Sequence, residues 1–314
     1  MKELALWKFI LENLRSEKAV IFMCVVESNG SSPGRRGFKM AVTLTELCGS
    51  IGGGIMEHKF VEMAKEILKE QTHNLILKKQ VHSKNVSTNQ SGMICSGEQT
   101  LVVYPVKQND ISVIQQIVSS LEKNLLLSFQ LSQEGFLLST DNIENKFEMI
   151  SASVWKYTEQ LGYKNFIHII GGGHVSLAFS KLMRDLNFHV SVYDDREELN
   201  TIQQNIYAHE KYFVNYEHID REIHYGSDFV VIMTTGYRSD SIVLRKLLDK
   251  KLRYLGLLGS KAKVRKMLAE LQAEGIDKSL INAIYAPVGI QINSQTPEEI
   301  AVSIAAEIIK LKNT

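Results

Sequence analysis

Cysteine is scarce in this chain, which rules out most architectures built on it. Among 314 residues there are three cysteines, Cys24, Cys48 and Cys95. They are odd in number and far apart, and no two form a Cys-x-x-Cys pair, which argues against a disulfide framework and against a structural zinc site. Any cysteine chemistry is therefore expected to be that of a single thiol.

The chain also lacks net charge and long apolar runs. Lys and Arg number 36 against 35 Asp and Glu, so no positive field attracts nucleic acid or an anionic membrane, and neither is expected as a partner. No apolar run approaches the roughly eighteen residues that a membrane span needs. Residues 1–20 have an amphipathic helical pattern without a signal-peptide cleavage site. We therefore expect a cytoplasmic protein.

The length and the order of patterns predict two domains. Residues 1–160 mix helical periodicity with β-branched apolar runs, which is typical of a mixed α+β domain. From residue 165 onward, apolar strands alternate regularly with amphipathic helices, which predicts a doubly wound parallel sheet with helices on both faces. The expected fold is thus α/β, with a second domain at residues 161–314 and a linker near residues 161–164.

A glycine-rich turn joins the first strand and helix of the second domain. The strand FIHII is followed at once by GGGHVS, residues 171–176, and then by an amphipathic helix. Gly171 and Gly173 allow a tight turn and let backbone N–H groups approach a phosphate at the helix start. His174 and Val175 begin the helix, where His174 is either a phosphate donor or a solvated residue. The pattern predicts a Rossmann-type turn that holds a nucleotide or pterin phosphate.

Two acidic residues strengthen this interpretation. Asp194 and Asp195 lie at the end of the next strand, where a carboxylate commonly binds a ribose 2′-hydroxyl. Asp194 would disfavour a 2′-phosphate. The same turn serves several dinucleotides and other phosphates, so it does not identify the ligand. The alternative is a glycine-tightened turn without ligand and with surface aspartates.

The first domain has a second glycine-rich loop before a helix. In GSIGGG, residues 49–54, the candidate anion contacts are Ser50, Gly52, Gly53 and Gly54. The Lys-Ser/Thr pair of a P-loop is missing, so the signal is weak by itself.

Two arginines and one cysteine are further candidates in this domain. Arg35 and Arg36, between two glycines, form either a two-point phosphate clamp or a solvated charged loop. Cys95 lies among small residues that leave a thiol accessible, and the alternative is a small residue filling a turn.

Several motifs occur in one order and together resemble a known family. They are GSSPGRRGFKM, GSIGGGIMEH, MICSGE, IIGGGHVS with VYDDR, YLGLLGSKAK and APVGIQINSQTPEEIAVSIAAEI. The chain resembles the XdhC/CoxI family of xanthine dehydrogenase accessory proteins from about residue 25 to 308, with little contribution from residues 107–164.

The resemblance implies a chaperone rather than an enzyme with its own turnover. Such a protein binds molybdenum cofactor, as molybdopterin or its dinucleotide form, and delivers the sulfurated form to a xanthine dehydrogenase-type molybdoenzyme, with a cysteine desulfurase as a further partner. The glycine and arginine loops and the Rossmann turn are then expected to hold the cofactor. Cys95 would face the molybdenum end as a metal ligand, which suits a soft thiolate.

The sequence departs from the family pattern at three places. Cys95 is followed by Ser96 where the family usually has glycine, and Ser176 replaces the last glycine of the turn. Thr234 is followed by Thr235 where the family usually has histidine, which puts any role of that histidine in doubt.

Two other functions use the same signals. An NAD(P)-dependent oxidoreductase would use Gly171, Gly173 and Asp194, but the second domain offers no convincing catalytic acid or base. A nucleotide-sensing interaction protein would bind adenine nucleotides without carrying a cofactor. A homodimer is expected only because homodimers are common.

Overall fold

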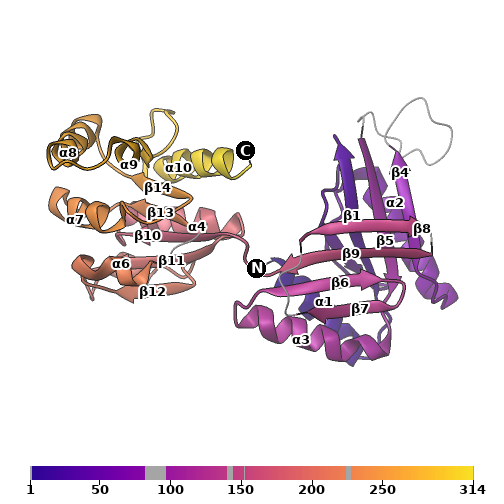
Figure 1. The fold of residues 1–314 in the computed structure, drawn as a ribbon. Coiled ribbons are helices and arrows are strands. Elements are labelled where there is room, and N and C mark those ends of the chain that lie inside the picture. The colour runs from indigo at the N-terminus through magenta and orange to yellow at the C-terminus, as the bar shows by residue number, and fades with distance from the viewer. Residues whose placement is uncertain (1, 82–96, 140–143, 152, 224–227, 314) are drawn as a thin grey trace. The chain divides into compact units, whose positions relative to one another are not determined.

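The computed structural model describes residues 2–81, 97–139, 144–151, 153–223 and 228–313. The chain divides into two compact units, Met1–Gly162 and Tyr163–Thr314 (Figure 1). The first unit has antiparallel sheets and helices and the second has a parallel sheet, which confirms the expected fold class. No helix among the described residues is long and apolar enough to cross a membrane.

The first unit contains two antiparallel sheets. The five-stranded sheet has the order β3-β2-β1-β5-β4 and the four-stranded sheet the order β7-β6-β9-β8. The strands are β1 Ile21–Gly30, β2 Lys39–Val42, β3 Leu47–Gly49, β4 Ile76–Val81, β5 Gly97–Pro105, β6 Leu127–Ser132, β7 Gly135–Ser139, β8 Lys146–Ser151 and β9 Val154–Leu161.

Apolar side chains cover both faces of the five-stranded sheet. On one face Phe22 packs with Trp7 of α1 (Lys2–Arg15) and with residues of α3 (Ile111–Glu122), which follows the short η1 (Gln108–Asp110). On the other face Met23 packs with Phe60 of α2 (Gly54–Glu70). Successive residues of β1 point to opposite faces, so burial on both explains why this strand is apolar at every position of its first half.

The second unit is built on a six-stranded parallel sheet of order β12-β11-β10-β13-β14-β15. The strand order reverses between β10 and β13, and ligands of such sheets bind outside the carboxyl ends of the strands at this point. The strands are β10 Phe166–Ile170, β11 His189–Asp194, β12 Glu210–Phe213, β13 Phe229–Ile232, β14 Tyr254–Leu257 and β15 Ile284–Tyr285.

Helices cover both faces of this sheet. One core contains Phe179 and Met183 of α4 with Ile304 and Ile308 of α10. The opposite core contains residues of α6, α7 and α8. The helices are α4 His174–Asp185, α5 Asn200–Gln203, η2 Tyr216–His218, α6 Ile219–Glu222, α7 Tyr237–Leu247, α8 Lys261–Ala273, α9 Lys278–Asn282 and α10 Pro297–Lys312.

Strand β12 lies in a segment for which the sequence pattern predicts a helical connection. Among the described strands it pairs with β11 alone, as an edge strand, and all four of its residues are exposed. An edge strand without a buried face has no reason to alternate apolar and polar residues, so the sequence carries no strand signal there.

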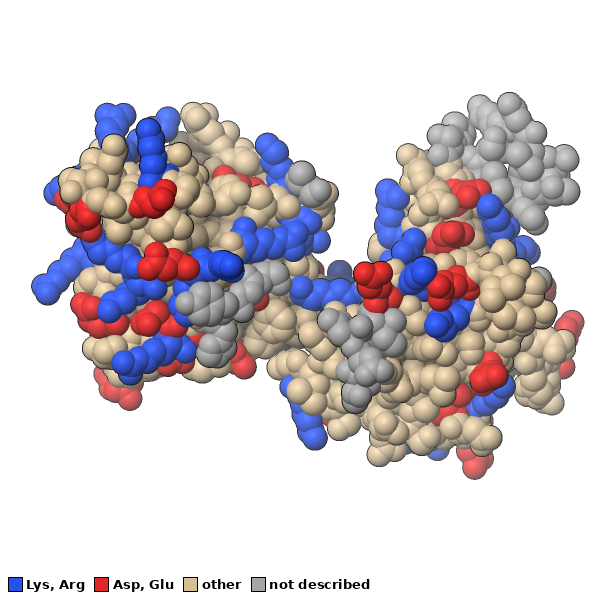
Figure 2. All heavy atoms as spheres, in the orientation of Figure 1, with Lys and Arg blue, Asp and Glu red and all other residues tan. Residues whose placement is uncertain are grey.

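Charges of both signs are mixed over the drawn face of each unit (Figure 2). This agrees with the formal net charge of +1.

Candidate functional site

The Rossmann turn begins at Gly171, where the backbone leaves β10. Its φ of +112° is unfavourable for residues with a side chain, and a Cβ would lie 2.3 Å from the carbonyl oxygen of Met233. The close approach holds the turn against the end of β13, at the point where the strand order reverses. Gly171 is therefore required for the fold of the turn itself.

Gly172 closes one side of the turn. Its N–H donates to the Asp194 carboxylate at 2.7 Å, and its carbonyl accepts a hydrogen bond from the Thr201 hydroxyl. A Cβ at this position would lie 2.2 Å from Ile202 of α5. This side of the turn is filled by protein.

Gly173 leaves the other side of the turn open. It is the N-cap of α4 without a side-chain hydrogen bond, and no atom lies within 4 Å of where its Cβ would be. His174 is exposed, whereas the Val175 side chain packs on the core and offers only its backbone. The first turn of α4 therefore combines free space with helix N–H groups that lack partners within the helix, as phosphate binding requires.

Asp194 is fully buried and its carboxylate is already engaged. Besides the N–H of Gly172, it binds the Arg196 guanidinium through two hydrogen bonds of 2.8 Å and the Arg196 N–H at 3.0 Å. Although burial raises the pKa of Asp194, these hydrogen bonds hold it below its ordinary value. A ribose hydroxyl at Asp194 would have to replace one of these donors, whereas the Asp195 side chain is 46% exposed.

A polar network that the sequence pattern does not predict lies beside this turn. The buried Asp240 of α7 accepts hydrogen bonds from the Thr234 N–H at 3.0 Å and hydroxyl at 2.6 Å, and it forms an ion pair with Lys263 of α8. The network joins the loops that follow β13 and β14 at the carboxyl edge of the sheet. Its only signal in the sequence was an aspartate in the first turn of a helix.

In the first unit, the predicted loops do lie together. A Cβ on Gly34 would be 2.2 Å from the Ile51 carbonyl oxygen, and one on Gly52 would be 2.4 Å from the Gly34 nitrogen. A Cβ on Gly97 would be 2.6 Å from the Ser32 nitrogen. Glycine at these positions thus lets three chain segments pack backbone to backbone.

The donors of the glycine loop, residues 49–54, are occupied by the protein's own Glu57. Its carboxylate accepts from the Ser50 hydroxyl at 2.6 Å and from the N–H groups of Ile51 and Gly53, each at 2.9 Å. Burial raises the pKa of Glu57, but these donors outweigh it and hold the pKa below its ordinary value. A phosphate can therefore use this loop only if Glu57 moves away, so anion binding there stays a prediction.

The two arginines of the neighbouring loop are exposed. Arg35 donates to the Gly30 carbonyl at 2.9 Å and Arg36 to the Asn145 carbonyl at 3.2 Å. No carboxylate of the described residues pairs with either guanidinium. Their positive charges thus remain available to an anion.

A buried ion cluster lies next to this arginine loop and contacts it at Gly37. Lys39 pairs with Glu159 and Glu3 and donates to the Gly37 carbonyl at 3.1 Å, and the Tyr157 hydroxyl donates to Glu159. Burial opposes the charge on Lys39, but the two glutamates raise its pKa above the ordinary value. The cluster connects α1, β2 and β9, and its hydrogen bond to Gly37 holds the end of the arginine loop in place.

The two described thiols differ in burial, since Cys24 is buried and Cys48 only partly so. Burial raises the pKa of Cys24 and, less strongly, that of Cys48, so both remain protonated at neutral pH. Cys95 lies outside the described residues. Within the described part of the chain, no group of three His, Cys, Asp or Glu side chains is placed to hold a metal ion.

Comparison with known families agrees with both halves of this description. A model of the XdhC Rossmann domain matches residues 167–308, and a model of the XdhC and CoxI family matches residues 14–78. The chain belongs to the XdhC and CoxI family. Membership confirms the resemblance that the motif order indicates.

Curated relatives of this family member match about half of the chain. The uncharacterized protein YqeB of Escherichia coli K12 is 34% identical over 157 residues, which are 48% of this chain and 28% of that protein. A protein of Bacillus subtilis 168, described as a probable subunit of xanthine dehydrogenase, is 29% identical over 157 residues, 50% of this chain and 46% of that protein. The chain therefore matches less than half of the length of either relative.

A solved structure supports the fold. A protein described as a xanthine dehydrogenase from Bacillus halodurans has a TM-score of 0.75 and 24% identity, over 100% of this chain and 96% of that one. At this identity the likeness concerns the architecture.

Proposed function

We propose that this XdhC and CoxI family member is an accessory protein that binds molybdenum cofactor and delivers its sulfurated form to a xanthine dehydrogenase-type molybdoenzyme. The observation that carries the proposal is the open start of α4 at Gly173 in a chain of this family. Two similar proteins are described as xanthine dehydrogenase or as part of it.

The described residues fit the phosphate end of such a cofactor. Molybdopterin carries a terminal phosphate and its dinucleotide form a pyrophosphate, and both can accept hydrogen bonds from the N–H groups at the start of α4. Gly173 leaves space for them. In the first unit, Arg35 and Arg36 form no ion pair with a described carboxylate, so their guanidinium groups can separately bind a phosphate. A bound molybdenum centre would supply the sulfido group that the client enzyme receives.

Cys95 is the thiol that we assign to the molybdenum end. A metal ligand must be a thiolate, and burial keeps Cys24 and Cys48 protonated. A soft thiolate suits a sulfur-rich molybdenum centre, and a cysteine desulfurase is the class of partner that would supply the sulfur.

Purification from cells that make molybdenum cofactor tests the proposal. The full chain is assayed for molybdenum and for the oxidised pterin released on denaturation. Near-stoichiometric pterin is expected, and Cys95→Ser should lower delivery to apo-enzyme, whereas the matched variant Cys48→Ser should not. Equal delivery by both variants would reject the thiol role.

A nucleotide titration of the same preparation distinguishes cofactor delivery from the alternative function, which depends on NAD(P) or another nucleotide. Because Arg196 already engages Asp194, an NAD ribose would have to compete for that carboxylate or use the exposed Asp195. Protein without pterin that nevertheless binds NADH tightly would replace the carrier by an NAD(P)-dependent oxidoreductase or a nucleotide sensor.

A further inference from the structure

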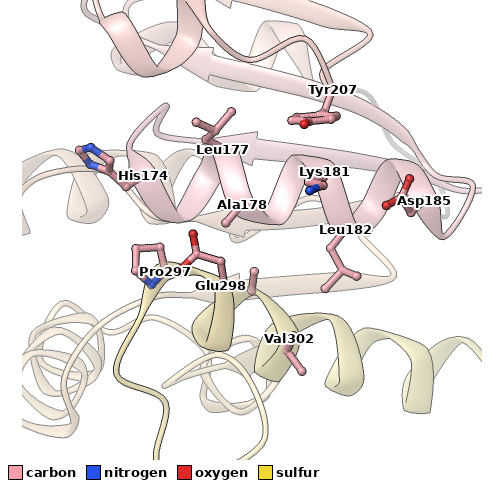
Figure 3. A pocket seen from close by; sticks show the side chains of 11 residues that line it. His174, Leu177, Ala178, Lys181, Leu182, Asp185, Tyr207, Pro297, Glu298 and Val302 are labelled. Carbon is pink, nitrogen blue, oxygen red and sulfur yellow. The ribbon is translucent and has the colours of Figure 1, made fainter.

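A groove of about 390 Å³ lies between α4 and α10 of the second unit and is lined by side chains of both helices (Figure 3). Its floor is apolar and is formed by Leu177, Ala178 and Leu182 of α4 with Ala301 and Val302 of α10. Val302 is 51% exposed. An exposed apolar patch with polar residues at its rim commonly marks a contact with another protein, a membrane or a ligand.

The polar and charged side chains of the groove lie toward its two ends. His174 and Glu298 lie where both helices begin, and Lys181 and Asp185 lie toward the other end (Figure 3). Asp185 is in the last turn of α4, next to the negative end of the helix macrodipole, where an acidic residue is unfavourable. No ion pair within the described part of the chain compensates Asp185 or Glu298.

We propose that this groove is the docking surface for the same groove of a second copy of this chain, related by a two-fold axis that sets the two α4 helices antiparallel. Reversing α4 on itself places His174 opposite Asp185 of the partner subunit. It also places Leu177 opposite Leu182 of the partner subunit. The small Ala178 leaves room for the stem of Lys181 of the partner subunit.

Charge complementarity argues for this occupant. In the antiparallel arrangement, Glu298 meets Lys181 of the partner subunit, which has the opposite charge, and a ring N–H of His174 can donate a hydrogen bond to Asp185 of the partner subunit. The positive end of one α4 macrodipole also lies beside Asp185 of the partner subunit. Any surface that complements itself under a two-fold rotation forms a closed dimer.

Sedimentation of the full chain over a range of concentrations tests this proposal. We expect a dimer, and we expect Val302→Glu and Ala178→Arg each to raise its dissociation constant at least about tenfold, because each buries a charge in the apolar floor. Val154→Glu is the matched control, since Val154 is 52% exposed in the first unit, and it should leave the dimer unchanged. Unchanged thermal unfolding of Val302→Glu excludes misfolding as the cause.

Charge reversal is the more specific measurement. Asp185→Lys should weaken the dimer, because it removes the acceptor for His174 of the partner subunit and puts a positive charge beside the positive end of that subunit's α4 macrodipole. Adding His174→Asp in the same chain should restore the dimer, because the two new side chains carry opposite charges. A wild-type monomer at all concentrations would overturn the proposal. A dimer that none of these substitutions affects would also overturn it. The same holds for a small molecule or a different protein bound in the groove of a monomer. Because pterin binding is assayed separately, failure of this interface is distinguishable from failure of the cofactor proposal.

Discussion

The backbone N–H of Gly172 donates to the Asp194 carboxylate at 2.7 Å, which ties the Rossmann turn to the end of the neighbouring strand. The same carboxylate holds the Arg196 guanidinium. Asp194 thus fixes the shape of the turn from within, and the open space at Gly173 lies on the other side. Substitutions on the first side of the turn should therefore affect stability, whereas a substitution at Gly173 should affect ligand binding.

Asp194→Asn should destabilise the second unit by about 1–3 kcal/mol, because it removes charged hydrogen bonds in a buried place. The folded pKa of Asp194 is depressed, so its contribution is present above the unfolded pKa of about 3.9 and is lost as pH falls through the folded pKa. Urea unfolding should therefore show that the free energy of unfolding of the variant differs from that of the wild type at pH 7 and that this difference is smaller in acid. Asp195→Asn is the control and should leave the midpoint unchanged; equal effects of the two substitutions would contradict this account.

Substitutions at Gly171 and Gly173 should separate folding from binding. Gly171→Ala forces a Cβ to 2.3 Å from a carbonyl oxygen at φ +112°, and we expect a loss of more than about 2 kcal/mol in stability. Gly173→Val meets no atom within 4 Å, so the protein should fold normally while its side chain fills the space for phosphate. Thermal unfolding and the pterin content of purified protein measure the two effects. Normal pterin content in Gly173→Val would show that the phosphate binds elsewhere.

Glu57→Gln should lower the free energy of unfolding by about 1–3 kcal/mol. A neutral amide accepts the hydrogen bonds from Ser50, Ile51 and Gly53 less strongly than a carboxylate does. The folded pKa of Glu57 is lowered, so the wild-type advantage should fade as pH falls through it. Chemical denaturation at several pH values checks this. Glu62→Gln on the same helix is the control, since Glu62 is exposed and pairs only with Lys65 among the described residues.

If the loop is also an anion site, Glu57→Ala should gain thermal stabilisation from inorganic phosphate that the wild type lacks. Equal phosphate responses of wild type and variant would leave the loop a purely structural element.

Elements with a periodic apolar face could be predicted closely from the sequence. β10, the Rossmann turn and α4 follow one another as predicted. These features are local, because strand and helix periodicity and glycine position are written in adjacent residues. The exposed edge strand β12 has no such pattern and was missed.

The partners of buried charges could not be predicted for a different reason. Glu57 and Asp240 are ordinary helix residues in the sequence, and only the fold shows that one fills a glycine loop and the other holds Lys263. Asp194 was singled out as a ribose ligand, which stays a prediction, and its engagement by Arg196 depends on side-chain geometry that spacing does not encode. Lys263 lies 23 residues from Asp240 and Gly172 lies 22 residues from Asp194, so only the tertiary structure brings these pairs together.

The buried Lys39 gives the largest expected stability effect. Lys39→Met would leave Glu159 and Glu3 buried without a counter-charge, which should cost about 3–5 kcal/mol in urea unfolding at pH 7. The raised pKa of Lys39 means that its contribution is fully present below the unfolded pKa of about 10.4 and disappears only as pH rises through the folded pKa. Lys18→Met is the matched control, because Lys18 is exposed and lies 3.8 Å from Glu46. Similar unfolding midpoints for the two variants would mean that the cluster does not hold α1, β2 and β9 together.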